Sequence, residues 1–194
     1  MSRDESAPLR ALFLDGPRVY LRPLEKDDLG LLRQWANDPE IRGLTGEVWP
    51  TGPASMEEFW QKTQTDSSRV WFAIVVKEGL RLIGECGLLR MFPPWRTTDL
   101  SLILGDKAAR RQGYGTEAIR LLLDYAFGHL NFHRVAIGVV GSNAGALRFY
   151  EQAGFKPEGV QREGYYYRHR YEDFVMMSIL ENEFRALPPI PGFS

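Results

Sequence analysis

The sequence predicts an α/β domain built on a mixed β-sheet, and three observations support this prediction. The apolar stretch 100–104 has the pattern of a strand, and a glycine-bearing turn at 110–116 leads from it into a segment with apolar residues at helical spacing. A second strand-like segment at 134–140 and a second helical segment follow. Further strand-like segments lie before and after this central β-α-β-α unit. We therefore expect a sheet flanked by helices, with strands in both directions.

The composition is that of an ordinary globular protein and argues against several classes. The 194 residues, 44% apolar and 25% charged, favour one domain with a real core. The net charge of −1 argues against duplex nucleic acid as a partner. Cys86 is the one cysteine, and the histidines lack metal-ligand spacing, so we expect no disulfide and no metal site. Without an apolar signal core or a membrane-spanning run, a cytoplasmic protein is expected.

The first half of the chain is expected to hold two helices and three strands. We expect a tail or partly docked arm over residues 1–16, one domain over residues 17–183 and a second tail over residues 184–194. The elements expected next are a strand at 19–23, a helix at 27–37, a loop at 40–54, a helix opened by the capping-box spacing of Ser55 and Glu58, and strands at 70–77 and 82–90 joined by a turn at Gly79.

The second half is expected to hold the central unit and two closing strands. A link at 91–98 precedes the strand 99–104, the glycine turn and its helix. After the strand 134–140, Ser142 or Asn143 is expected to cap a helix that ends at a left-handed Gly154. Alternation between 160 and 180 predicts the last two strands.

The turn between strand and helix is the strongest functional signal in the chain. It reads Arg110, Arg111, Gln112, Gly113, Tyr114, Gly115 and Thr116. Such a turn can aim consecutive backbone N–H groups at one point, with the positive end of a helix behind them, and its arginines add fixed positive charge. This suits an anion, above all the pyrophosphate of a cofactor. The spacing differs from that of triphosphate and dinucleotide loops. A turn of this kind taken alone can also be purely structural.

A second motif, from Asn143 to Phe155, decides between these interpretations. Together the two segments resemble the GNAT superfamily of acetyl-CoA-dependent N-acetyltransferases. In that family an Arg/Gln-x-x-Gly-x-Gly/Ala turn binds the CoA pyrophosphate, and its positions are occupied by Arg110, Gly113 and Gly115. The second signature is met by Asn143, Ala146, Phe149, Tyr150, Gly154 and Phe155. The resemblance implies the GNAT fold, a mixed central sheet flanked by helices, over residues 17–183.

The ends of this domain look like one branch of the family. The Leu-Arg-Pro-Leu start and the closing Gly-Tyr-Tyr-Tyr-Arg run resemble acetyltransferases of ribosomal-protein N-termini, of spermidine and of amino-sugar nucleotides. That spread leaves the acceptor open. A protein N-terminus or a small amine is the first choice, and an amino-sugar nucleotide is the alternative. A CoA-binding regulatory module without turnover is the alternative from a different class. Homodimers are common in the branch, so a homodimer stays open.

The resemblance also implies how acetyl-CoA, the co-substrate, is held. Backbone N–H groups from Arg111 to Thr116 would hold the pyrophosphate, and Arg110 would shape the loop or neutralise charge. Asn143 would bond to the pantetheine, cap its helix, or do both. A main-chain N–H of the preceding strand would stabilise the oxyanion of the thioester. The cofactor-binding set is thus Leu102, Ile103, Leu104, Arg110, Arg111, Gln112, Gly113, Tyr114, Gly115, Thr116, Asn143, Ala146 and Tyr150.

Three residues are candidates for catalysis. By resemblance, Tyr150 gives a proton to the leaving CoA thiolate or orients the sulfur; the alternative is a core aromatic residue. The acceptor amine arrives protonated, because its pKa lies near 10, so a base is needed. Asp99 is the first candidate, at the start of the strand that enters the turn, and Glu85 is the second. Either could instead bind a cationic acceptor. Cys86 is expected to be a small core residue, since direct attack needs no acyl-enzyme.

The acceptor groove is expected between the loop 40–54 and the turn around 162–172. Trp49 and members of the run Tyr165-Tyr166-Tyr167 could line it. The second segment is basic, which favours an acidic or phosphorylated partner over a polycation such as spermidine.

Overall fold

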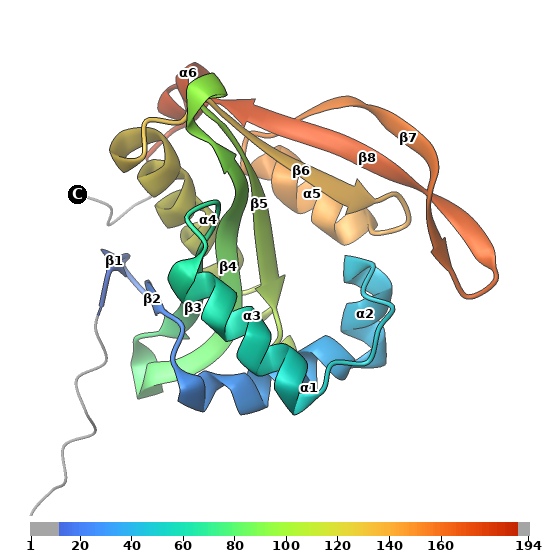
Figure 1. Ribbon diagram of the computed structural model, residues 1–194. Helices are drawn as coiled ribbons and strands as arrows, with labels where there is room; N and C mark the ends of the chain where they lie inside the picture. Colours follow the sequence, from blue (N-terminus) through green and yellow to red (C-terminus); the bar gives the residue numbers. More distant parts are fainter. Residues whose placement is uncertain (1–11, 190–194) are drawn as a thin grey trace, which may run out of the picture.

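The computed structural model describes residues 12–189, and within them the chain forms one eight-stranded sheet flanked by helices (Figure 1). The strands are β1 (Leu14–Asp15), β2 (Val19–Pro23), β3 (Val70–Val76), β4 (Arg81–Phe92), β5 (Thr97–Leu104), β6 (Arg134–Val140), β7 (Lys156–Tyr167) and β8 (Arg170–Leu180). The helices are α1 (Leu29–Asn37), α2 (Pro39–Thr45), α3 (Pro53–Thr65), α4 (Tyr114–Asp124), α5 (Ala144–Gln152) and α6 (Glu181–Arg185). The strand order is β1-β2-β3-β4-β5-β6-β8-β7.

The sheet is mixed, as predicted, because one pair of neighbouring strands is parallel. β5 and β6 run in the same direction, joined by the crossover through α4, while the other neighbours are antiparallel. The parallel pair is short. Thr97 to Asp99 pair with Arg134 to Ala136. Beyond these residues β5 and β6 do not pair with each other. The sheet therefore opens between the second halves of β5 and β6.

Two apolar layers cover the two faces of the sheet. Figure 1 shows α1 and α3 on the face opposite to α5. The layer beneath α4 and α5 includes Leu100, Ile119, Leu122, Val135 and Tyr150. The layer beneath α1 and α3 includes Leu32, Met56, Ala73 and Val75. Because side chains alternate along a strand, Leu100 points toward α4, and the adjacent Asp99 points to the face that carries α1 and α3.

The predicted strands and the central helices are confirmed, with shifts of one to four residues at several ends. The helix expected at 27–37 is a 3₁₀ turn (Lys26–Asp28) followed by α1, and α4 continues as a π-helical turn (Tyr125–His129). Asn143 caps α5, since its Oδ1 accepts a hydrogen bond of 3.1 Å from the backbone N–H of Ala146. Gly154 follows that helix with φ of +98°, the predicted left-handed conformation.

The segment 40–54 is not wholly a loop, because α2 occupies Pro39–Thr45. The Asp38 carboxylate accepts hydrogen bonds from the backbone N–H groups of Glu40 and Ile41, at 2.9 and 3.1 Å. Pro39 stands at the first helical position, where its missing N–H costs nothing. Asp38 and Pro39 thus end α1, as expected, and also begin a second helix.

The capping box predicted at Ser55 and Glu58 is wrong. The helix α3 begins two residues earlier, at Pro53, with Gly52 as its N-cap and no side-chain cap. Proline presets the backbone for the first helical position, and this outweighs the serine signal.

The links and tails also differ in detail from the prediction. The link expected at 91–98 is shorter, because β4 runs to Phe92 and β5 begins at Thr97. In the expected N-terminal arm, Leu14 and Asp15 pair with Leu21 and Tyr20. In the expected C-terminal tail, α6 runs as far as Arg185. The remaining tail residues 1–11 and 190–194 lie outside the described residues.

Candidate active site

The turn predicted to bind an anion ends at the N-terminus of α4, whose N-cap residue is a glycine. Gly113 is the N-cap of α4, with φ of +84°, and Arg111 has φ of +61°. Successive left-handed and right-handed residues form the concave arrangements of N–H groups that bind anions in proteins. Within the described residues no side chain accepts a hydrogen bond at this cap. The first-turn N–H groups of α4 are therefore available to a phosphate, and the site fits the pyrophosphate of CoA.

A buried carboxylate fixes this turn to the sheet. Glu117, in the first turn of α4, accepts hydrogen bonds from the backbone N–H groups of Arg18 and Val19, at 2.6 and 2.8 Å, and from Arg18 Nε at 3.1 Å. Arg18 Nη1 donates to the Gln112 carbonyl at 3.0 Å, and its guanidinium lies 5.0 Å from the Tyr114 ring centroid. The turn is thus held before any ligand arrives.

The contacts of Arg110 are those of a loop-shaping residue. Its Nε donates to the Leu104 carbonyl at 3.2 Å, and its Nη1 lies 2.6 Å from Glu40 Oε1. Lys107 pairs with Asp38 and Glu40 at 3.0 and 2.9 Å. These ion pairs connect the turn to the start of α2.

One edge of β5 lacks a strand partner where the sheet opens. Leu102, Ile103 and Leu104 pair with Cys86, Glu85 and Gly84 of β4 on one side. On the other side β6 has diverged after Ala136. Apart from the Leu104 carbonyl, which accepts from Arg110, the backbone groups of this edge have no partner on β6, so an extended amide chain can pair with them as in β-augmentation.

Asn143 links the second motif to α2. Its Nδ2 donates to the Leu44 carbonyl at 3.3 Å, while its Oδ1 caps α5. Tyr167 Oη donates to the Pro39 carbonyl at 3.5 Å. The two segments expected to build the acceptor groove meet in space, because the Tyr167 ring lies against Gly43 and the Tyr165 ring against Gly46. Figure 1 shows α2 beneath the β7–β8 hairpin.

Tyr150 is 5% exposed. Its ring packs against Phe149 and Phe155, at centroid distances of 5.0 and 5.4 Å. Burial, with a smaller contribution from the Cys86 thiol, raises the pKa of Tyr150. Burial also raises the pKa of Cys86. Both groups keep their protons at neutral pH, so Tyr150 can donate one and Cys86 is a poor nucleophile.

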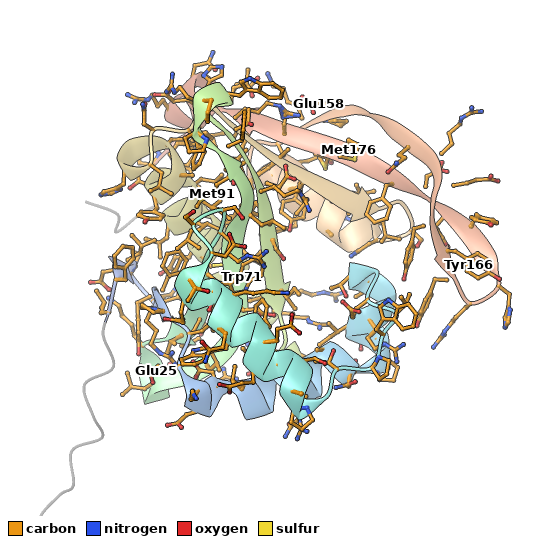
Figure 2. All side chains as sticks on the ribbon, in the orientation of Figure 1. Glu25, Trp71, Met91, Glu158, Tyr166 and Met176 are labelled. Atoms are coloured by element: carbon orange, nitrogen blue, oxygen red, sulfur yellow. The ribbon has the colours of Figure 1, made fainter. Side chains whose placement is uncertain are left out.

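A cavity of about 270 Å³ lies where the sheet opens, and Asp99 is part of its wall. The strands that form it are β5, β6, β7 and β8, with a contribution from the end of β4. Its lining residues are Arg90, Asp99, Ile137, Gly138, Gln161, Gly164, Phe174 and Met176. Figure 2 shows Met176 on β8, on the long hairpin. Asp99, the first base candidate, thus faces a cavity large enough for a small molecule.

Glu85, the second base candidate, lies on the same sheet face but outside this cavity wall. It is opposite Ile103, whereas Asp99 is opposite Leu89. Four residues of strand separate the two positions, a distance of ~13 Å. The half-buried Glu85 accepts a hydrogen bond of 3.0 Å from Trp71 Nε1. Burial raises its pKa to about 7, against the opposing effect of the Trp71 hydrogen bond.

The sequence analysis missed two residues near the site, and three residues expected at the acceptor groove are not part of the cavity wall. Arg90 was missed because its position depends on a strand irregularity. Glu117 could have been found as an acidic residue within an apolar helical pattern. Trp49 is 76% exposed and does not line the cavity. Tyr165 is buried, and Tyr166 is exposed beside Tyr171.

Within the described residues, no helix is both long and apolar enough to cross a membrane, and no group of three or more acidic, histidine or cysteine side chains could hold a metal ion.

The splayed parallel strands, the glycine-capped helix after them and the cavity at the splay form the site of an α/β enzyme that can hold an anionic cofactor beside a second substrate. The chain belongs to the GNAT acetyltransferase family: the sequence model of the Acetyltransferase (GNAT) domain matches residues 18–156. The resemblance inferred from the two motifs is confirmed. The protein is an acetyl-CoA-dependent N-acetyltransferase, so the regulatory-module alternative is not retained.

Bacterial relatives are similar over most of the chain. A probable N-acetyltransferase, YjcK, of Bacillus subtilis is 31% identical over 175 residues, 86% of this chain and 96% of the relative. Spermidine N(1)-acetyltransferase of Vibrio cholerae is 28% identical, over 86% of this chain and 95% of the relative. The structure of spermidine N-acetyltransferase from Vibrio cholerae in complex with CoA and spermine superposes with a TM-score of 0.81 at 27% identity, covering 87% and 98% of the two chains.

Proposed function

We propose that this enzyme acetylates a primary amine, of a small molecule or a peptide N-terminus, by direct attack of the amine within a complex that holds both substrates. The observation that carries this proposal is the arrangement along β5. An uncapped helix N-terminus follows one end of its unpaired edge, and the cavity beside Asp99 lies at the other. From Leu104 to Asp99 the strand spans ~17 Å, a length suited to an extended pantetheine arm.

Binding of the donor is assigned to the turn and the open strand edge. The N–H groups of residues 111–116 hold the pyrophosphate, and the unpaired edge of Leu102 to Leu104 pairs with the pantetheine amides. Asn143 and Ala146, at the start of α5, lie beside the arm. When bound, acetyl-CoA supplies an acetyl thioester activated for attack by an amine.

Asp99 is the base that removes the proton of the acceptor amine, directly or through a water molecule. Geometry comes before pKa in this choice, because a base must reach the proton that it takes. Asp99 lines the cavity, whereas Glu85 does not. Glu85 stays the alternative, with a pKa suited to proton transfer near neutrality.

Stabilisation of the oxyanion is assigned to the backbone, and protonation of the leaving sulfur is assigned to Tyr150. A main-chain N–H on the open edge of β5 stabilises the oxyanion, a contribution of about 3 kcal/mol for one such donor in other enzymes. Tyr150 keeps its proton because burial raises its pKa. It therefore donates a hydrogen bond, and then the proton, to the leaving sulfur.

An acceptor screen tests this function. Purified protein is incubated with acetyl-CoA and, in turn, N-terminal peptides, polyamines, simple amines and amino-sugar nucleotides, and the release of free thiol is followed. The relatives named for spermidine support a small amine. An amino-sugar nucleotide stays the alternative acceptor, and a cytoplasmic location and a homodimer stay predictions. Thiol release with none of these amines would contradict the proposal.

A further inference from the structure

The cavity beside Asp99 carries an arginine as well as a carboxylate. Arg90 Nε donates a hydrogen bond to Asp99 Oδ2, and both residues line the cavity. The Arg90 side chain is 72% exposed and that of Asp99 is 29% exposed. Ion pairs at this exposure are weak and screened by water, so a ligand can open this one easily. Each partner is then free to take a charged group of opposite sign.

A strand irregularity places Arg90 on this face of the sheet. Leu89 is opposite Asp99, and Phe92 is opposite Thr97, so two residues of β4 stand against one residue of β5. Arg90 is the first of the two and has φ of +52°. Regular alternation after Leu89 would turn Arg90 toward the face that carries α4. The bulge redirects it to Asp99. A non-glycine residue in the left-handed region is a strained feature of the kind that gathers at functional sites.

The charge of the cavity wall suits a ligand with both signs of charge. Arg90 and Asp99 are its charged residues, and the other lining residues are neutral. Near the hairpin tip, Arg170 pairs with Glu172, and Arg168 lies over the Tyr167 ring. A polyamine would bring one ammonium to Asp99, and its further positive charges would find no second carboxylate in the wall. An ammonium with a nearby anion satisfies both members of the pair.

We propose that the acceptor is a primary amine that also carries a carboxylate or a phosphate a few bonds away. This rests on the proposed acetylation of a primary amine at the same site. The ammonium replaces Arg90 at Asp99, and the anion accepts hydrogen bonds from the guanidinium, which binds carboxylate and phosphate oxygens in the same paired manner. Phe174 and Met176 pack against the short chain between the two groups. Arg90 is thus a residue that determines specificity, and its bulge sets the distance between the two charges.

The test compares acceptors in matched pairs. Glycylglycine is set against glycylglycinamide, and glucosamine 6-phosphate against glucosamine, with spermidine as the polycation. We expect kcat/KM to favour the anionic member of at least one pair by about 10- to 100-fold, the effect of a charge-assisted hydrogen bond. The pair that shows the preference distinguishes carboxylate from phosphate. Spermidine should be the poorer acceptor.

Variants then assign the preference to Arg90. Arg90→Gln should remove the difference within each pair by lowering kcat/KM for the anionic member far more than for the neutral one, while Arg90→Lys should keep part of the difference. Arg185→Gln is the matched control, because Arg185 is 68% exposed and pairs with a single carboxylate, Glu181, on α6. Arg185→Gln should leave kcat/KM unchanged for both members of each pair. Thermal unfolding of each variant shows that it is folded.

Two results would overturn the inference while leaving acetyl transfer intact: a preference for spermidine over every anionic amine, or an equal loss for both members of each pair in Arg90→Gln. If wild type acetylated no amine, the proposed function itself would fail. Calorimetry on the CoA-bound protein would then decide the inference. Tighter binding of glycylglycine or glucosamine 6-phosphate than of its neutral partner supports it, and equal affinities overturn it.

Discussion

Trp71 of β3 donates a hydrogen bond of 3.0 Å from its indole N–H to Glu85 of β4, on the sheet face that also carries Asp99. The indole packs edge-on against Phe59 of α3, at a centroid distance of 5.5 Å. The carboxyl group thus lies in an apolar setting with one fixed donor. Burial prevails over the hydrogen bond and raises the pKa of Glu85 to about 7. The two carboxylates of this face therefore differ in environment, and experiment can separate their roles.

Asp99→Asn is expected to lower kcat about 10²- to 10⁴-fold, the usual contribution of a general base. Its amide cannot accept the proton of the amine in the cavity. Glu85→Gln should lower kcat by less than about tenfold, because Glu85 lies outside the cavity wall. Steady-state kinetics at saturating acetyl-CoA give both values. The opposite ranking would assign the base to Glu85.

Glu85→Gln should also change how stability depends on pH. The folded-state pKa of Glu85 is raised from 4.5 to about 7, so the folded protein favours the protonated form. The stabilisation linked to this raised pKa is complete below 4.5, the pKa of Glu85 in the unfolded chain. It is lost as the pH rises through about 7. Above that pH the buried charge costs up to about 3 kcal/mol.

The glutamine variant has no charge to bury. Urea unfolding at about pH 5 and about pH 8.5 should therefore show the variant gaining stability relative to wild type at the higher pH. Parallel changes in the two proteins would mean that Glu85 does not titrate in this range.

Tyr150→Phe is expected to lower kcat about 10²-fold, as loss of a general acid does, with little change in KM for acetyl-CoA. Stability should be little affected, because phenylalanine keeps the ring that packs against Phe149 and Phe155. Kinetics together with thermal unfolding test both statements. A fall in stability with unchanged kcat would make Tyr150 a core residue only.

Gly113→Ala should weaken acetyl-CoA binding. At φ of +84° a side chain is strained by about 1 kcal/mol. The added Cβ would also lie 2.9 Å from Arg18 Nη2 and push it from the turn. We expect KM for acetyl-CoA to rise about tenfold, equivalent to about 1.4 kcal/mol of binding free energy.

Gly79→Ala is the control. Gly79 has φ of +72°, and a Cβ added there would meet no other atom within 4 Å. Gly79→Ala therefore has the same backbone strain as Gly113→Ala, without the contact with Arg18. It should lose similar stability and keep KM. An equal rise in KM for both variants would show that the effect comes from general destabilisation rather than from the turn.

The local geometry of the turn and of the second motif was predicted well from the sequence, because its signals are local. The turn at 110–116, the cap at Asn143 and the left-handed Gly154 each depend on a few neighbouring residues. Propensity and spacing therefore located them before any tertiary contact was known.

The cavity proposed to hold the acceptor could not be predicted in the same way, because it depends on strand register. Nothing near Arg90 in the sequence reveals the bulge that brings it to Asp99, since the bulge exists only in the pairing of β4 with β5. The separation of Glu85 from Asp99 likewise follows from that register. At α2, Asp38 and Pro39 signalled the end of one helix, and the start of the next was missed because both functions use the same residues.

The proposed mechanism depends above all on direct transfer from acetyl-CoA to an amine without an acyl-enzyme. To test this step, the protein is incubated with acetyl-CoA, first alone and then with an accepted amine, and thiol release and the masses of protein and amine are followed. We predict that the protein stays unmodified without amine, because Cys86 is buried as a neutral thiol, and that thiol release requires the amine and matches its acetylation one to one. Stoichiometric acetylation of the protein before amine is added would contradict direct transfer.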